Sequence, residues 1–232
     1  MRKLSDFEIL TFDCYGTLID WEQGINASLV PILASHRLNL NRDELLQKYA
    51  TLEAEAEDGP YQTYREILRR VLEGFGKQYD FKPTEQQLDV FAESVTSWPP
   101  FEDSPEALRR LQSVYKLAVL SNIDDDLFAA SAARLGIEFD FVFTAQQIGS
   151  YKPSINNFHY TIERLGLAPE RILHVAQSLY HDIVPAQKVG LTTVWINRRH
   201  DQTGSGATPE AEAIPDFEYP DMRSFAGSAL GE

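Results

Sequence analysis

The sequence has very little cysteine and no long apolar run. Cys14 is the single cysteine among 232 residues, so no disulfide can form within the chain. No apolar stretch approaches the ~18 residues needed to cross a bilayer, and the residues after Met1 lack the apolar core of a secretion signal. The sequence therefore predicts a protein of the reducing cytoplasm that has no membrane partner, and Cys14 is expected to be a small buried side chain.

Basic residues are also scarce. The chain has 21 Lys and Arg against 35 Asp and Glu, which gives a formal net charge of −14. Such a field repels nucleic acid, so no nucleic-acid partner is expected, and a small anionic substrate would need a locally positive pocket. The 43% of apolar residues excludes a disordered chain. The length allows one domain with an insertion, and it leaves a monomer and a homodimer equally open.

Short apolar runs alternate with helical patterns over most of the chain. Strand-like runs occupy 7–12, 116–120, 140–144, 171–176 and 191–196. Helical patterns occupy 105–115, 125–136, 155–166 and 180–190, and most end in glycine. This alternation predicts an α/β protein with a doubly wound parallel sheet that helices cover on both faces.

The stretch 18–98 interrupts this rhythm because it holds helical patterns and no convincing strand. These patterns lie at 21–38, 42–58, 61–76 and 84–98, before a Trp98-Pro99-Pro100 hinge. We predict a core domain of 1–17 and 99–232 and an inserted helical cap domain of 18–98. The alternating glutamates of 53–57 are expected to be a solvated helix face, and 200–216 an exposed loop.

Polar residues follow the ends of the predicted strands, where parallel sheets bind their ligands. They are expected to converge on one crevice from separate elements. Several have simpler alternatives, since Asp13, Ser121 and Asp182 could cap helices and Lys152 could be an exposed turn residue. The set that follows the strands comprises Asp13, Tyr15, Gly16, Thr17, Ser121, Asn122, Lys152, Gln177, Ser178 and Asp182.

Four segments in order, FDCYGTL, LSN, YKP and HVAQSLYHDIVPAQKVG, resemble the motifs of the haloacid dehalogenase superfamily, and most of all those of the 2-haloacid dehalogenases. The resemblance implies a Rossmann-like core with a helical cap and an aspartate nucleophile at Asp13. It also implies a hydroxyl at Ser121, a lysine at Lys152 and an acid at Asp182. The activity implied is hydrolysis of small 2-haloacids to 2-hydroxy acids through an ester on Asp13, with no cofactor.

Each of these residues has an expected role in that chemistry. Lys152 is expected to hold the pKa of Asp13 down, and Thr17 is expected to turn its hydroxyl toward the substrate. Asp182 is predicted to position the hydrolytic water. The predicted substrate-binding residues are Tyr15, Ser121, Asn122, Ser178 and Arg65.

The superfamily also contains Mg²⁺-dependent phosphatases, whose pattern this chain breaks twice. They resemble DxDGT and GDSxxND, whereas this chain has Tyr15 at the second acidic position of the first motif and Gln177 at the first acidic position of the last. Loss of an acid and of a metal ligand disfavours phosphate chemistry, so no metal is expected. A phosphatase and a catalytically inactive ligand-binding protein remain as alternatives.

The cap is expected to supply an arginine and aromatic residues to the substrate, as in similar dehalogenases. Arg65 beside Tyr64 is the preferred candidate, although a solvated helix arginine is an equally simple interpretation. His181 is expected to be a surface histidine. The other cap candidates, which the sequence cannot rank, are Arg37, Arg69, Arg70, Tyr61 and Trp21.

Overall fold

The computed structural model describes residues 2–202 and 204–232, and these residues form a six-stranded parallel sheet of order β3-β2-β1-β4-β5-β6. The central strand β1 pairs with β2 on one side and with β4 on the other. This arrangement is the doubly wound, Rossmann-like α/β fold predicted from the sequence. The strands are β1 (Ile9–Phe12), β2 (Lys116–Ser121), β3 (Phe141–Thr144), β4 (Ile172–Ala176), β5 (Thr192–Ile196) and β6 (Phe217–Tyr219).

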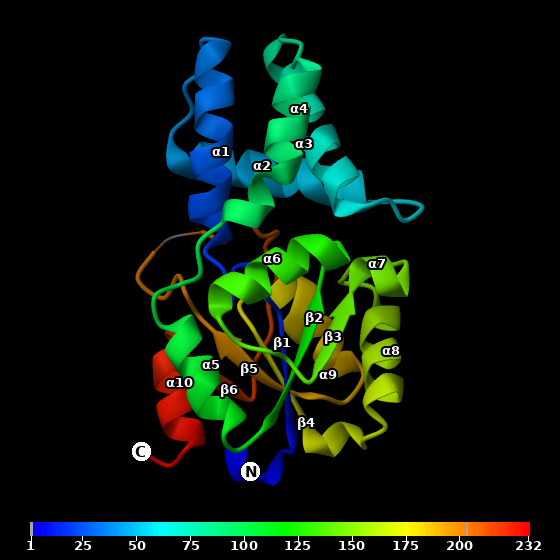
Figure 1. The fold of residues 1–232 in the computed structure, drawn as a ribbon, viewed down its shortest axis with the longest axis vertical. Helices are drawn as coiled ribbons and strands as arrows, with labels where there is room; N and C mark the ends of the chain where they lie inside the picture. The colour runs from blue at the N-terminus through cyan, green and yellow to red at the C-terminus, as the bar shows by residue number, and fades with distance from the viewer. Residues whose placement is uncertain (1, 203) are drawn as a thin grey trace.

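Successive residues of each strand pack on opposite faces of the sheet, which separates the apolar core into two layers. On β1, Leu10 and Phe12 join one buried cluster and Ile9 joins the other. The first layer lies under α5 (Ser104–Gln112), α6 (Asp125–Leu135) and α10 (Met222–Ala229). The second lies under α8 (Ile155–Leu165) and α9 (Val184–Lys188) (Figure 1). Both faces are therefore covered, which explains why the strands read as continuous apolar runs.

Four helices between β1 and α5 stack over the carboxyl ends of the strands, at the top of Figure 1. They are α1 (Trp21–Ser35), α2 (Arg42–Glu57), α3 (Tyr64–Tyr79) and α4 (Glu85–Glu93). Each begins at a polar residue whose side chain accepts a hydrogen bond from the first turn. These helices form the cap, and their buried face is continuous with the first core layer. The proposed division at 17/18 and 98/99 stays a prediction.

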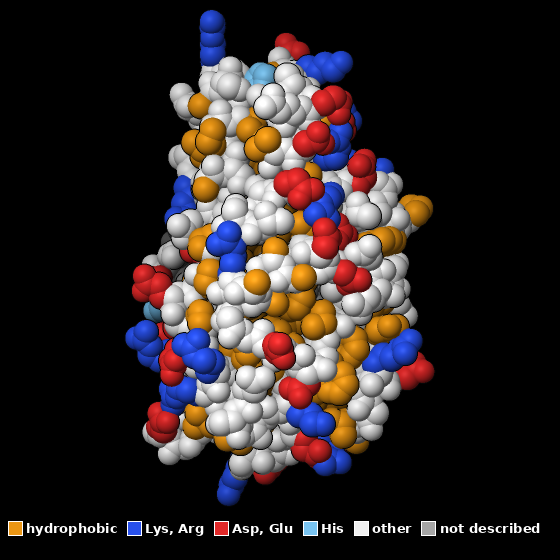
Figure 2. All heavy atoms as spheres, viewed as in Figure 1, with side chains coloured by type: hydrophobic (Ala, Val, Ile, Leu, Met, Phe, Trp, Pro, Cys, Tyr) orange, Lys and Arg blue, Asp and Glu red, His pale blue; other side chains and the backbone are white. Residues whose placement is uncertain are grey.

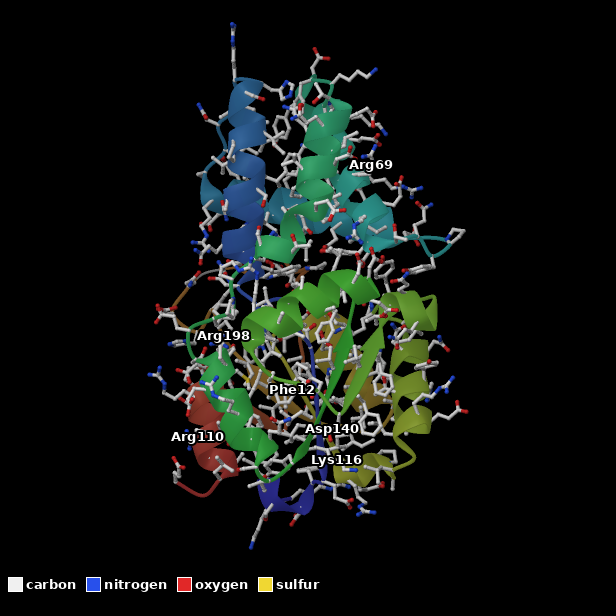
Figure 3. The ribbon with its side chains drawn as sticks, viewed as in Figure 1. Phe12, Arg69, Arg110, Lys116, Asp140 and Arg198 are labelled. Atoms are coloured by element: carbon white, nitrogen blue, oxygen red, sulfur yellow. The ribbon has the colours of Figure 1, made fainter. Side chains whose placement is uncertain are left out.

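One half-buried arginine connects the two chain segments that link core and cap. Arg198 donates to the carbonyl oxygen of Thr17 at 2.8 Å and binds the Asp103 carboxylate at 2.9 Å. Thr17 precedes the cap and Asp103 follows it, so a single side chain spans both crossings. Figure 3 shows Arg198 near the start of α5, below the cap. We expect this contact to limit how far the cap can move away from the sheet.

The predicted strands and most predicted helices are confirmed, with three differences. The sequence prediction missed β6 and α10. The single helix expected at 180–190 is instead a π-helix, Leu179–Ile183, followed by α9. Pro185 lies inside the expected helix and has no backbone N–H to continue its regular hydrogen bonding. Within the described residues, no helix has the length and apolarity needed to cross a bilayer.

The loop 200–216 is the third difference, because it is not wholly exposed as expected. Thr203 lies outside the described residues, but Ala207 and Thr208 are buried. The backbone N–H of Ala207 donates to Glu22 of α1 at 3.3 Å, and Arg199 also binds Glu22, at 2.8 Å. The loop is therefore attached to the cap and closes one side of the region between cap and core.

Candidate active site

Lys152 lies at the centre of the predicted site and is 1% exposed. Its ammonium donates to Asp13 Oδ1 at 2.9 Å, to Asp182 Oδ1 at 2.6 Å and to the carbonyl oxygen of Leu120 at 3.0 Å. An ammonium has three N–H donors, so this set uses all of them. The structure thus brings together the three residues that the sequence analysis placed after three different strands.

Asp13 directly follows β1 and has a hydrogen bond on each carboxylate oxygen. Oδ1 accepts from Lys152, and Oδ2 accepts from the Thr17 hydroxyl at 2.6 Å. Burial raises the pKa of Asp13, and Lys152 and Thr17 act in the opposite direction without fully compensating. The expectation that Lys152 keeps this pKa low is therefore wrong for the net shift, because desolvation is the larger effect.

Asp182 is fully buried and is held from two sides. Its Oδ1 accepts from Lys152 and pairs with His174 Nε2 at 3.0 Å, whereas Oδ2 has no hydrogen-bond partner within the described chain. Burial opposes ionisation, but Lys152 and His174 lower the pKa of Asp182 overall. The carboxylate is thus ionised and keeps one free acceptor atom at the cavity that it lines. The sequence analysis missed His174, which reads as an ordinary residue of a buried strand.

The turn after β1 explains the glycine and threonine of FDCYGTL. Gly16 has a φ of +93°, and a Cβ at this position would lie 3.0 Å from Trp21 Nε1. The turn brings the Thr17 hydroxyl under Asp13, where it also accepts from the backbone N–H of Gln177 at 2.8 Å. The expectation that the Thr17 hydroxyl faces the substrate is therefore wrong, because both of its hydrogen bonds are made within the core. The hydroxyl holds the Asp13 carboxylate from below.

The four predicted core substrate contacts fall into two kinds. Ser121 lines a cavity in front of Asp13, and its buried Oγ has no partner among the residues described. Asn122 accepts from the Lys152 N–H at 2.7 Å and donates to the Lys152 carbonyl at 2.9 Å, so it holds the lysine backbone. Ser178 accepts from the His181 N–H, and the Tyr15 hydroxyl pairs with Ser131 at 2.8 Å. Only Ser121 keeps an uncommitted polar atom.

Two adjoining cavities separate the cap from the core. The inner one has a volume of about 30 Å³, room for little more than one or two water molecules. The outer one, of about 580 Å³, shares Glu57, Lys152 and His181 with it and leads outward. Described residues that line the inner cavity are Asp13, Tyr15, Trp21, Glu53, Glu57, Tyr64, Ser121, Asn122, Lys152, Ser178, His181, Asp182 and Thr208.

The cap wall of the inner cavity is acidic, which corrects the interpretation of 53–57 as a solvated face. Glu53 is 4% exposed, and its Oε1 accepts from the hydroxyls of Tyr49 at 2.8 Å and Tyr64 at 2.6 Å. Burial raises the pKa of Glu53 to about 7, although both hydroxyls act to lower it. Burial, followed by the charge of Glu53, also raises the pKa of Glu57 well above its ordinary value. Tyr64 and Trp21 line this wall as well.

Arg65, the preferred cap arginine, is not in the cavity. Its guanidinium binds Glu93 of the cap at 2.6 Å and Asp126 of the core at 2.7 Å, on the outer surface. Arg37 and Arg70 are exposed, and Arg69 lies on the flank of the cap (Figure 3), bound to Glu85 and Asp89. Lys152 is thus the one Lys or Arg among the described residues that line the inner cavity.

The cap is held closed by a core carboxylate. Asp124, at the start of α6, accepts from the backbone N–H groups of Tyr64 at 2.9 Å and Arg65 at 3.2 Å. These are the first amides of α3, so a core carboxylate accepts the free N–H groups at the N-terminus of a cap-domain helix. Tyr151 adds a hydrogen bond to the carbonyl of Gln62 at 2.8 Å and a stacked ring contact with Tyr61.

His181 is buried, not at the surface as expected. Its backbone N–H is bound by Ser178, and its ring lines both cavities. Burial lowers the pKa of His181 to about 4, because desolvation outweighs the attraction of Asp182. The imidazole is therefore neutral near pH 7. Cys14 is fully buried, in agreement with the sequence interpretation, and burial raises its thiol pKa.

The residues present do not fit the magnesium site of the phosphatase pattern. Asp13 and Asp182 are the carboxylates available on the core side, and both are bound to the Lys152 ammonium. Position 15 is a tyrosine with a committed hydroxyl, and position 177 is an amide. In the described part of the chain, no three His, Cys, Asp or Glu side chains gather as metal ligands would. We therefore derive no step through a metal.

A Rossmann-like sheet with a helical cap and a buried aspartate–lysine pair at the strand ends is the architecture of a capped α/β hydrolase. Residues 7–190 match the haloacid dehalogenase-like hydrolase family, and the chain belongs to this family. An (S)-2-haloacid dehalogenase of Burkholderia cepacia is 27% identical over 209 residues, which cover 88% of this chain and 86% of that protein.

Other relatives are phosphatases. A glyceraldehyde 3-phosphate phosphatase of Methanothermobacter thermautotrophicus is 34% identical over 101 residues, 42% of this chain and 45% of that protein. Among solved structures, the L-2-haloacid dehalogenase of Xanthobacter autotrophicus has a TM-score of 0.77 at 22% identity, over 97% of this chain and 99% of that one. This likeness shows the fold, and it does not by itself assign a substrate.

Proposed function

We propose that this chain hydrolyses the carbon–halogen bond of small 2-haloacids or their close derivatives through an ester on Asp13. The observation that carries the proposal is the fully committed Lys152 ammonium between Asp13 and Asp182. It supplies the positive charge that a buried nucleophilic carboxylate needs.

The leaving group distinguishes this reaction from phosphate ester hydrolysis. An alkoxide must be protonated as it leaves, whereas chloride or bromide departs without a proton. Tyr15 stands where the phosphatases have their general acid, and its hydroxyl is bonded to Ser131 at 2.8 Å, away from that task. A displacement at carbon therefore fits the core side better than phosphoryl transfer does.

The proposed reaction has two steps. An oxygen of Asp13 attacks the halogen-bearing carbon from the side opposite the halogen, so that a C–O bond forms and the halide leaves with its electron pair. Water then adds to the ester carbonyl of Asp13, the hydroxylated product departs, and the carboxylate is restored with release of one proton. Asp182 Oδ2, which has no partner in the described chain, would accept a hydrogen bond from that water.

The test is halide release from 2-chloropropionate and from its neutral derivatives, measured with protein treated with EDTA. Mass spectrometry of protein quenched during turnover should find the ester on the peptide that contains Asp13. Absence of halide from every short 2-halogenated compound would refute the proposal. Mg²⁺-stimulated release of phosphate from small phosphate esters would favour the phosphatase alternative, which the partial similarity to phosphatases keeps in view.

A further inference from the structure

We propose that the cap wall, through Glu53 and Glu57, selects a substrate whose cap-facing group donates N–H hydrogen bonds, an amide or an ammonium, over one that presents a carboxylate. This inference rests on the proposed function, because it concerns the substrate class of the same site. It departs from the expectation that a cap arginine receives a substrate carboxylate.

The cavity offers little positive charge that could stabilise an anionic ligand. Lys152 is the one cation that lines it in the described chain, and its three N–H groups are all taken by protein oxygens. A substrate carboxylate would have to displace one of those bonds. It would also lie beside the carboxyl groups of Asp13 and Asp182, which share a single ammonium, so the described residues of the core wall have no further positive charge to offer an anionic ligand.

The Glu53 carboxyl group acts as a hydrogen-bond acceptor in the cap wall. Both hydrogen bonds to it come from phenol hydroxyls and end on Oε1, at 2.6 and 2.8 Å. Its second oxygen has no recorded partner in the described residues, although the side chain is 4% exposed and lines the cavity. An N–H group of a ligand in the cavity would supply this oxygen with a hydrogen-bond donor.

Glu57 extends this acceptor wall toward the entrance. Within residues 2–202 and 204–232 it has no hydrogen-bond or ion-pair partner, and it lines the inner and the outer cavity. Glu55 and Asp58 line the outer cavity on the same cap segment. The cap side of the path to Asp13 therefore carries carboxyl groups and no Lys or Arg among the described lining residues. It offers hydrogen-bond acceptors to a ligand but no positive charge to an anion.

A second observation marks the ligand position. Ser121 Oγ is buried, lines the inner cavity and has no partner among the described atoms. It faces the same space as Glu53 and Glu57 but belongs to the core. A ligand that places its reacting carbon near Asp13 and Ser121 and its N–H group toward the cap would give Ser121 Oγ a partner and donate to the cap carboxyl groups.

The test compares three substrates of one carbon skeleton, which are 2-chloropropionate, 2-chloropropionamide and methyl 2-chloropropionate. They present an anion, a neutral N–H donor and a neutral group without N–H. We expect kcat/KM for halide release to be at least tenfold higher for the amide than for the acid or the ester. Glu53→Gln and Glu57→Gln should each lower the amide-to-acid ratio about tenfold. Glu73→Gln, an exposed cap glutamate on α3, is the matched control and should leave the ratio unchanged.

Binding of unreactive analogues keeps the inference separate from the proposed reaction. Calorimetry should show propionamide binding more tightly than propionate, and Glu57→Gln should remove that preference. An ammonium arm with n-propylamine distinguishes a cationic from a neutral donor. Tighter binding of propionate, or a preference that survives both glutamine variants, would overturn the inference. Absence of halide release with the amide preference intact would refute only the proposed function.

Discussion

Both walls of the inner cavity carry carboxyl groups, but among the described residues only those of the core wall contact a cation. On the core wall, Asp13 and Asp182 share the Lys152 ammonium at 2.9 and 2.6 Å. On the cap wall, Glu53 and Glu57 have no cation within ion-pair distance in the described chain, and burial raises the pKa of both. The difference teaches that burial and contact with the cation together, and not residue type, set the direction of each carboxyl pKa. The pKa of Asp182 is lowered, whereas burial keeps the pKa of Asp13 raised even beside Lys152.

The core and the cap also differ in how firmly they are built. The core wall rests on strand ends in register, with Asp13 following a central strand. The cap wall rests on helices that contact the core through Asp124 and a few aromatic residues. We therefore expect changes in the core wall to abolish the reaction, and changes in the cap wall to alter substrate preference and pH dependence.

The largest effect should come from Asp13→Asn. An amide is a poor nucleophile, so halide release should fall by at least roughly a thousandfold. The fold should survive, because the amide oxygen can still accept from Lys152 and the amide NH2 can donate to the Thr17 hydroxyl oxygen. Steady-state halide assays and a thermal melt measure both outcomes. Substantial activity in this variant would show that the core wall does not carry the chemistry.

Lys152→Met should have the next largest effect, on stability. It leaves Asp13 and Asp182 buried without their cation, at a cost of about 3–5 kcal/mol in the free energy of unfolding. Urea titration measures this loss. In an Asp13→Asn background the same change should cost less, since one buried charge has been removed. Equal costs in both backgrounds would contradict the shared ion pair.

Glu53→Gln should change how stability depends on pH. The folded-state pKa of Glu53 is about 7 against an ordinary 4.5, so the protonated form is favoured by folding. The associated stability is fully present below pH 4.5 and is lost as pH rises through 7, by about 3 kcal/mol in total. Unfolding curves between pH 5 and pH 8 should show this decline in the native chain and a flatter profile in the variant. Glu73→Gln should keep the native slope.

The smallest effect is expected for Arg65→Ala. Its ion pairs with Glu93 and Asp126 lie at the surface, where such pairs contribute about 0.2–1 kcal/mol each. The backbone hydrogen bonds from α3 to Asp124 do not need the side chain. We expect kcat/KM to change less than about threefold. A loss of kcat/KM as large as that of Asp13→Asn would contradict this placement and indicate that Arg65 contacts the substrate.

Local sequence patterns were sufficient to predict the main elements of the fold and the core side of the site. The strand runs, the helical insertion and the residues after β1, β2, β3 and β4 could be read directly, because strand period and topology bring those positions to one sheet edge. The same reasoning found Asp13, Lys152 and Asp182. It missed β6, because three half-buried residues at a sheet edge give a weak signal.

The cap wall could not be read in this way. Glu53 and Arg65 both look like solvated helix residues, and nothing within α2 or α3 shows which helix face meets the core. Burial of Glu53 depends on how α2, α3 and the strand ends pack together, as does the outward position of Arg65.

The linear chain by itself determined the family, the parallel α/β architecture and the carboxylate and lysine at the edge of the sheet. These follow from motifs, local periodicity and the rule that parallel strands end at one edge. Tertiary packing alone decided which acids are ionised and what the cap presents to a ligand. The reason is that charge states and hydrogen-bond capacity depend on desolvation and on distances between segments far apart in sequence.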